Sequence, residues 1–414
     1  MTNSVATRRL PRPFLYLAWS NLAAQTAEQL ALAAAPLIAV LAFHAGEGIT
    51  GLLQAAQTLP FLLLALPAGV LADRLSRRRL LVAGESVRLV ALLVTLALLA
   101  TQSLNLPLLA LLGLAGATGT VVFSVAGPAL VPALVDRNAL AAANSRIELA
   151  RSAAFAAGPA LGGALVGSVG ATAAFAIATV LCAGAVVLMR GISEPPRDVA
   201  PRRQPLHELA EGARFVVTHA LLRPVLLTAV FFNISFFTLQ AVYVPYAIHH
   251  LELGASGVGA TMAVFGIGMV GAALAGPRIM RRLPLGKVIA IGPLAGLAAS
   301  VVMLSTVWWP SPWLAACSFL LIGAGAVLWV ISSTMLRQAV TPARLIGRAS
   351  AVIMTATYGA RPLGALIGAA VGGLAGAPWC LALAVVGFTV QAVIILTSPV
   401  FSLHEVPAEA STLA

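Results

Sequence analysis

Residues 69–81 read GVLADRLSRRRLL, a short basic sequence between two apolar runs at 50–72 and 80–101. Each run is long enough to cross a bilayer as a helix, so the basic sequence is predicted to be a tight turn at one membrane face. Gly69, at the end of the first run, would let another helix approach its backbone. Asp73 places a carboxylate at the membrane surface, where the arginines would favour the anionic leaflet.

The composition of the whole chain is that of an integral membrane protein. Of its 414 residues 60% are hydrophobic and only 9% are charged, with a mean hydropathy of +0.98, whereas about a quarter of the residues of a soluble domain are charged. The net charge of +12 does not indicate a nucleic-acid partner, because the basic residues fall between the apolar runs rather than on one polar face. Single cysteines within apolar runs indicate neither disulfides nor a metal site.

Twelve apolar runs predict an all-α membrane protein with twelve transmembrane helices in two six-helix halves. The runs lie at about 14–43, 50–72, 80–101, 106–134, 139–167, 170–190, 224–248, 257–278, 287–308, 312–338, 346–372 and 377–400. The longest connection, 191–223, separates an N-terminal half (1–190) from a C-terminal half (224–400) and a tail (401–414). From Pro205 its apolar residues recur at helical spacing, which predicts a helix along the membrane surface.

The positive charges predict how the chain is oriented. Lys and Arg occur in the connections of one side only, and none occurs in the opposite loops at 44–49, 102–105, 168–170, 249–256, 309–311 and 373–376. By the positive-inside rule both termini are expected in the cytoplasm. Arg outnumbers Lys by 24 to 1, which is typical of a GC-rich bacterial genome, so we expect a bacterial inner membrane protein.

The basic turn resembles the G-x-L-a-D-r-x-G-r-r-x-x-l signature between the second and third helices of the major facilitator superfamily of transporters. The matching residues are Gly69, Leu71, Ala72, Asp73, Arg74, Arg77, Arg78 and Leu81, whereas Ser76 replaces the inner glycine. The resemblance implies two related halves with substrate between them near the midplane. It also implies a gating motif (Gly69, Asp73, Arg74, Arg77 and Arg78), with Asp73 meeting the start of the eleventh span when the cytoplasmic side closes.

The fifth span contains AFAAGPALGG at 154–163. Three glycines and a proline weaken a helix and are expected where helices pack closely. The run resembles the g-x-x-x-G-P-x-x-G-G motif of exporters in the same superfamily at Gly158, Pro159, Gly162 and Gly163, with Ala154 in place of the first glycine. Close packing explains the same residues, and the resemblance adds a direction: export, as in the branch that exports macrolides and enterobactin.

Two ionisable residues lie deep in predicted spans, where charges are costly and usually functional. Glu28 is near the middle of the first span and Arg361 is at similar depth in the eleventh. We expect Glu28 to take up and release a proton while Arg361 tunes its affinity or contacts an anionic substrate. The alternative is a neutral, hydrogen-bonded Glu28 and an Arg361 that is paired for assembly alone.

Polar and aromatic side chains on the first and seventh spans predict a substrate cavity. Its candidate residues are Asn21, Gln25, Gln29, Asn233, Phe237 and Gln240. Core packing explains the aromatic residues of the seventh span equally well. Two shallower acid–base pairs, Glu85 with Arg88 and Glu148 with Arg151, are three residues apart and are expected as local ion pairs at the cytoplasmic mouth.

These features together predict a secondary active transporter. The chain has no Walker-type phosphate loop, so it is expected to be neither an ATPase nor another enzyme, and to need no cofactor. We expect proton-coupled export of hydrophobic or amphipathic small molecules, with substrate, protons and lipid as partners, no nucleic acid, and a monomeric state. The alternatives are a facilitator or importer of a polar metabolite and, from another class, a non-transporting membrane sensor.

Overall fold

The computed structural model describes residues 11–136, 139–194, 205–342, 344–405 and 407, apart from the side chains of residues 66, 73, 141 and 205–208. Long helices make up nearly all of it. In the N-terminal half they are α1 (Arg12–Leu41), α2 (Glu47–Arg74), α3 (Arg77–Ala100), α4 (Leu106–Leu134), α5 (Leu140–Ser168) and α6 (Ala171–Arg190). In the C-terminal half they are α8 (Leu222–His249), α9 (Ala255–Arg282), α10 (Leu285–Ser305), α11 (Pro312–Val340), α12 (Ile346–Ala375) and α13 (Ala377–Leu396).

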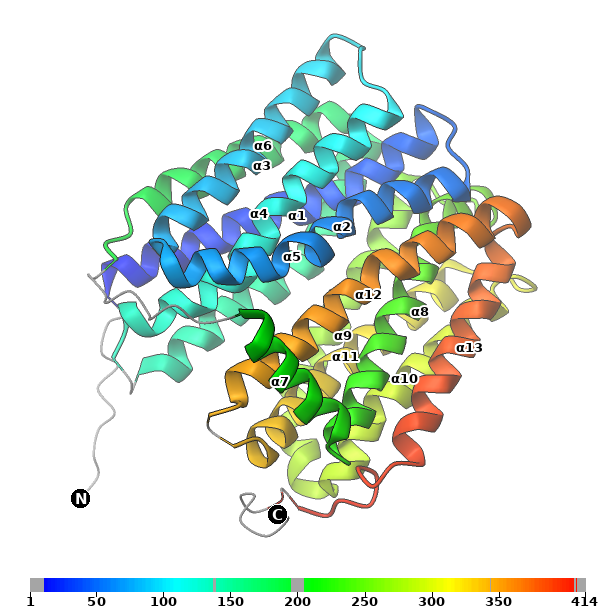
Figure 1. Cartoon of the computed structure of the whole chain (residues 1–414). Coiled ribbons are helices and arrows are strands. Elements are labelled where there is room, and N and C mark those ends of the chain that lie inside the picture. The colour runs from blue at the N-terminus through cyan, green and yellow to red at the C-terminus, as the bar shows by residue number, and fades with distance from the viewer. Residues whose placement is uncertain (1–10, 137–138, 195–204, 343, 406, 408–414) are drawn as a thin grey trace.

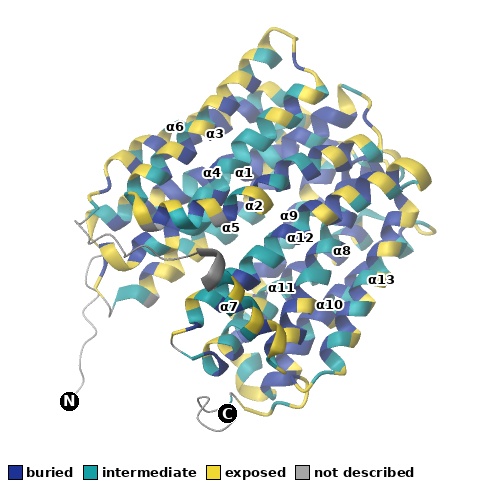
Figure 2. Ribbon diagram, in the orientation of Figure 1, coloured by how far each residue is buried: buried dark blue, intermediate teal, exposed yellow. Residues whose placement is uncertain are grey.

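The predicted all-α membrane fold is confirmed. Eleven helices of the described residues are long and apolar enough to cross a membrane. The remaining long helix, α12, is less apolar since it carries Arg348 and Arg361 within a glycine-rich sequence, and with it the long helices number twelve. Buried residues concentrate where helices face one another, as Figure 2 shows. Large apolar residues such as Leu374 and Trp313 lie exposed, as lipid-facing side chains do.

The loops gather at two ends of the bundle. The end that holds Arg74, Arg78, Arg282 and Arg348, called the arginine-rich end here, is also where α1 begins and α13 ends (Figure 1). The other end, called the opposite end, holds the loops that lack Lys and Arg. The turn between α2 and α3 is only two residues long. Ser76 ends this turn as the N-cap of α3, because its Oγ accepts a hydrogen bond from Arg79 N at 3.2 Å.

A shorter helix, α7 (Pro205–Thr218), follows the connection between the halves. It packs against α12 and α8, with Val216 wholly buried in the core of the C-terminal half. Glu211 of α7 binds Arg348 and lies 3.5 Å from Arg344 Nη1. These contacts attach α7 to the start of α12 at the arginine-rich end.

Two helix pairs carry most of the contact between the halves, α2 with α12 and α5 with α9. Near the opposite end α2 and α12 touch backbone to backbone, because a Cβ placed on Gly51 would lie 2.5 Å from Ala369 Cα. Near the arginine-rich end a Cβ on Gly69 or Gly347 would have no neighbouring atom within 4 Å. Figure 1 shows the two ribbons diverging in that direction. The halves are therefore closed at the opposite end and apart at the arginine-rich end.

Candidate functional site

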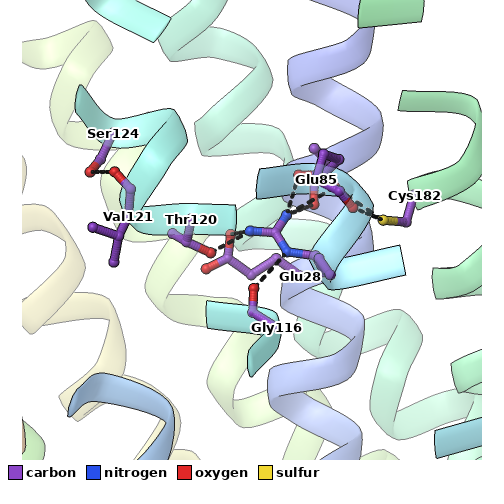
Figure 3. A network of polar contacts seen from close by, with 9 residues as sticks. Glu28, Glu85, Gly116, Thr120, Val121, Ser124 and Cys182 are labelled. Carbon is purple, nitrogen blue, oxygen red and sulfur yellow. Dashed lines mark hydrogen bonds and ion pairs between the residues drawn. The ribbon is translucent and has the colours of Figure 1, made fainter. Parts of the chain in front are cut away.

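A buried charged cluster lies inside the N-terminal half, around Arg88 of α3 (Figure 3). Arg88 Nη1 is 3.1 Å from Glu85 Oε2 on the same helix, and Nη2 is 3.6 Å from Glu28 Oε2 on α1. Glu85 and Arg88 are only 1% and 4% exposed, whereas the side chain of Glu28 is 15% exposed. Of the two acids, Glu28 is therefore the more exposed.

The α4 helix completes the surroundings of Arg88. Arg88 Nε donates to the carbonyl of Gly116 at 3.2 Å, and Nη2 donates to Thr120 Oγ1. A Cβ on Gly119 would lie 3.2 Å from Nη2, so a glycine there leaves the space that the guanidinium fills. On the other side, Cys182 Sγ of α6 donates to Glu85 Oε1 at 3.1 Å. Four helices thus hold one cation between two carboxylates.

This cluster corrects the predicted position of the Glu85 and Arg88 pair. The ion pair exists, but it lies in the middle of the bundle rather than at its mouth. Arg88 is eleven residues from the start of α3 at Arg77, which at about 1.5 Å per residue is about 16 Å along the helix axis. By contrast, Glu148 and Arg151 form a local ion pair on α5, and their side chains are 56% and 36% exposed.

Arg361 occupies a ring of aromatic side chains at the boundary between the halves. Its guanidinium carbon is 4.2 Å from the ring centroid of Tyr358, 5.1 Å from that of Phe61 and 5.4 Å from that of Phe237. Phe61 belongs to α2 of the other half. Arg361 Nε donates to Asn233 Oδ1 at 3.2 Å. The charge of Arg361 also interacts electrostatically with that of Glu28, so the two midplane residues predicted from the sequence lie in one region.

The predicted substrate-cavity residues do not form one surface. Asn21 is wholly buried and donates from Nδ2 to the carbonyl of Ile147 on α5 at 3.3 Å. Gln29 is 6% exposed and packs against Gly158. These two are corrections to the predicted cavity: both side chains fill the α1–α5 contact, because the small residues of α5 bring its backbone close to α1.

The other predicted residues lie nearer the boundary between the halves. Gln240 Oε1 accepts a hydrogen bond from Gln54 Nε2 of α2 at 3.4 Å. Asn233 and Phe237 both contact Arg361. Gln25 is partly exposed on α1. The C-terminal members of the predicted set therefore surround the point where α2, α8 and α12 meet.

The glycines of the fifth-span motif serve two different contacts. A Cβ on Gly158 would lie 2.2 Å from Gln29 Cβ, and one on Gly162 would lie 2.9 Å from Ala33 Cβ, so both glycines face α1 within their own half. A Cβ on Gly163 would lie 2.7 Å from Gly259 Cα of α9, across the boundary. The carbonyl oxygen of Pro159 also faces Gly259, since a Cβ on Gly259 would lie 2.4 Å from that oxygen.

At the basic turn, Glu194 is a residue that the sequence prediction missed. Its carboxylate accepts hydrogen bonds from Ser76 Oγ at 2.5 Å and from the backbone N–H groups of Arg77 and Arg78 at 3.1 Å each. A carboxylate at this place satisfies free N–H groups at the start of α3 and the positive end of its dipole. The available signal was a lone acid directly after the sixth span, on the same membrane side.

The arginines of the gating motif also hold neighbouring helices. Arg77 Nη1 donates to the carbonyl of Ala129 on α4, and Arg78 Nη2 donates to that of Arg190 at 2.5 Å. Arg74 is exposed at the end of α2. The side chain of Asp73 lies outside the described residues, so the gating role expected of it stays a prediction.

Comparison with known proteins gives consistent results. The profile of the Major Facilitator Superfamily matches residues 17–365. The chain is 29% identical over 265 residues to the uncharacterized MFS-type transporter y4rN of Sinorhizobium fredii, an alignment covering 60% of this chain and 63% of that protein, which is less than two thirds of its length.

Solved structures are similar in fold. A bacterial homologue of the iron transporter ferroportin in its inward-facing state superposes with a TM-score of 0.73 at 17% identity, covering 93% of this chain and 98% of the other. A D-xylose-proton symporter gives 0.73 at 13% identity, covering 94% and 98%. Such different cargoes on one fold mean that the fold by itself does not indicate the substrate.

Proposed function

The chain belongs to the Major Facilitator Superfamily of membrane transporters, and on that premise we propose that it exports hydrophobic or amphipathic small molecules in exchange for protons. It is a multi-pass membrane protein and a transporter rather than an enzyme. We place it in a bacterial inner membrane with both termini in the cytoplasm, in keeping with its arginine-rich end. The observation that carries the proposal is the partly exposed carboxylate of Glu28, which shares Arg88 with the buried Glu85.

The charge balance of this cluster supports proton exchange. Arg88 neutralises one carboxylate fully, while two lie within ion-pair distance of it. When Glu28 holds a proton, Arg88 can remain paired with Glu85 alone, so the cluster contains one cation and one anion and has no net charge. When Glu28 is ionised, it carries an additional negative charge into the region of Arg361. Protonation therefore changes the field at the boundary between the halves without unpairing Arg88.

The helix contacts supply a route from this proton site to the boundary. Glu28 lies on α1, and α1 packs against α5 through Gly158 and Gly162. The same helix α5 packs against α9 through Gly163. A change in the position of α1 would thus act on one of the two main contacts between the halves.

Alternating access fits the uneven contact between the halves. The arginine-rich end, cytoplasmic by our proposal, is the end at which α2 and α12 stand apart. An exporter loads its substrate from that side and must then close it. The gating motif and the start of α12 lie at that end, and their approach is the closing step that we propose.

Proton coupling is sufficient to drive such efflux. One charge that crosses 100 mV is worth about 2.3 kcal/mol, which corresponds to a roughly forty-fold concentration ratio at about 1.4 kcal/mol per tenfold. The exporter motif of α5 supports the outward direction. A facilitator or importer of a polar metabolite is the second candidate, and it is favoured only by the positive charge of Arg361.

The proposal is tested in everted membrane vesicles with an imposed pH gradient, over a panel of antibiotics, dyes and siderophores. We expect substrates of the protein to dissipate the gradient. In Glu28→Gln, uphill transport should be lost while downhill exchange remains, since the variant mimics the protonated acid permanently. Glu148→Gln is the matched control, because that acid is exposed on α5 and should be dispensable. Proton movement in step with substrate in Glu28→Gln would place the proton site elsewhere.

A further inference from the structure

Arg361 is a cation with no carboxylate partner within ion-pair distance among the residues that the structure describes. Its Nε donates to the amide oxygen of Asn233, and three aromatic rings surround its guanidinium carbon. The two terminal nitrogens, Nη1 and Nη2, donate to no described protein acceptor. Arg88 and Arg151, the other arginines deep in the spans near it, both have carboxylate partners. A guanidinium that is held in place while its two terminal nitrogens remain without acceptors is suited to bind an anionic group of a ligand.

A second polar group without a partner lies on the same helix face. Thr357 Oγ1 is buried and makes no hydrogen bond within the described part of the chain. Thr357 precedes Arg361 by four residues, so the two side chains lie one above the other on α12. Most threonines in these helices bond to a carbonyl one turn earlier, as Thr238 does to Ile234 at 2.8 Å. The unused hydroxyl of Thr357 is therefore available to an oxygen that lies along this face.

From these two observations we infer that the substrate is an organic anion with an aromatic or other apolar body. Its acidic group binds the free fork of Arg361, with the hydroxyl of Thr357 as a further donor. Its apolar body packs beside Phe61, Phe237 and Tyr358. The inference rests on the proposed function only in that the ligand lies between the halves, and it narrows the expected substrates from amphipathic molecules in general to amphipathic acids.

The aromatic rings make this arrangement selective for a planar acidic group. Cation–π contacts hold the guanidinium over Tyr358 and Phe61, which fixes its plane before a ligand arrives. A carboxylate can then bind both terminal nitrogens at once without reordering a long side chain. Because Phe61 comes from α2 and Tyr358 from α12, the site also contains residues of both halves and depends on their relative position.

A negative charge on the substrate also suits export. The interior of a bacterial cell is electrically negative, so the membrane potential itself drives an anion outward. Exchange of one proton for one singly charged anion moves two charges, which doubles the contribution of the potential to the driving force. Glu28, whose charge interacts with that of Arg361, is the acid that such an anion would meet across the boundary.

Three probes that share a naphthalene ring test the charge preference: naphthoate (anionic), naphthamide (neutral) and naphthylmethylammonium (cationic). Each is titrated calorimetrically into the purified full chain in detergent. We expect naphthoate to bind about tenfold more tightly than naphthamide, which corresponds to about 1.4 kcal/mol, and the ammonium probe to bind most weakly. Equal or tighter binding of either other probe overturns the inference, as does a lack of naphthoate binding at millimolar concentration.

Variants assign the preference to the two residues. Arg361→Gln should abolish the difference between naphthoate and naphthamide, and Thr357→Val should reduce it several-fold without altering the shape of the side chain. Arg146→Gln and Thr355→Val are matched controls, since Arg146 is exposed on α5 and Thr355 lies on another side of α12 from Thr357, and both should keep the full preference. A preference that persists in both Arg361→Gln and Thr357→Val places the anion elsewhere and contradicts the inference.

A proton count separates this inference from the proposed function. The naphthoate titration is repeated in two buffers of different ionisation enthalpy, which gives the protons released or taken up per bound probe. Release of protons supports exchange coupling, and uptake or no change contradicts it. Neither result alters the charge preference, so the anion site and the proton exchange are tested independently of each other.

Discussion

Arg88 is the residue on which the interior of the N-terminal half depends. Its guanidinium contacts Glu85 and Glu28 and donates to groups of α1 and α4. A buried ion pair contributes little net stability compared with an apolar pair, but an unpaired buried charge is costly. The loss of Arg88 would leave two carboxylates facing each other without a cation.

We therefore predict that Arg88→Gln lowers the stability of the folded protein by about 3–5 kcal/mol. The measurement is thermal unfolding in detergent, followed by the loss of the monodisperse peak in size-exclusion chromatography. Arg151→Gln is the control, because its pair with Glu148 is partly exposed and such pairs are worth about 0–1 kcal/mol. The double variant Arg88→Gln with Glu85→Gln should recover part of the loss. If Arg88→Gln is as stable as the unaltered chain, the prediction is wrong, because leaving the two carboxylates without a cation then costs no stability.

At the scale of elements, α5 connects the proton site with the boundary between the halves. One face of it contacts α1 and another contacts α9, and glycines make both contacts close. On α9 the contact extends to Gly266, where an added Cβ would lie 2.3 Å from Ala156 Cα. Further along α9 at Gly271 an added Cβ would meet no atom within 4 Å. The two glycines are five residues apart and lie on different sides of α9, so that Gly266 is buried against α5 whereas Gly271 is exposed.

This pair gives a matched prediction for the α5–α9 contact. Gly266→Leu should separate α5 from α9 and abolish transport, with a cost of about 1–3 kcal/mol from overpacking. Gly271→Leu should leave transport nearly unchanged. In parallel, a cysteine at position 256, near Gly167 of α5, should become more accessible to an impermeant thiol reagent in Gly266→Leu. Equal transport rates in Gly266→Leu and Gly271→Leu would contradict the prediction, because transport would then not depend on close contact between α5 and α9.

At the scale of the whole molecule, the two halves are joined at one end and apart at the other. Besides the backbone contacts of α2 with α12, the amides of Gln54 and Gln240 meet across the boundary at 3.4 Å. Both belong to the closed region, since α2 runs from the opposite end toward the arginine-rich end. Transport by alternating access requires this contact to break once in every cycle.

We predict that a reducible bifunctional thiol reagent cross-links Gln54→Cys to Gln240→Cys and stops transport. The reason is that the opposite end could no longer open to release substrate. Reduction of the cross-link should restore activity. The control pair is Tyr246→Cys with Thr306→Cys, whose hydroxyls are 2.8 Å apart within the C-terminal half, and a cross-link there should be tolerated. Full transport by the cross-linked Gln54–Gln240 pair would exclude rigid-body alternation of the halves.

The sequence alone determined the membrane class, the number of spans and the basic turn. These properties are local: twenty consecutive apolar residues must be helical in a bilayer, and a run of arginines between two spans must lie at a membrane face. The depth of Glu28 and Arg361 followed from their positions along their spans. The expected sidedness and the division at 191–223 also come from the sequence and stay predictions.

Only the tertiary structure decided which polar side chains meet. Arg88 lies next to Glu28, Glu194 caps α3, and Asn21 with Gln29 is buried against α5 instead of facing substrate. The spacing of residues along one helix cannot indicate which other helix it faces, since lipid is as apolar as the side chains and gives no hydrophobic preference between partners. Small residues and hydrogen bonds select the partner, and they act only when all the helices are assembled.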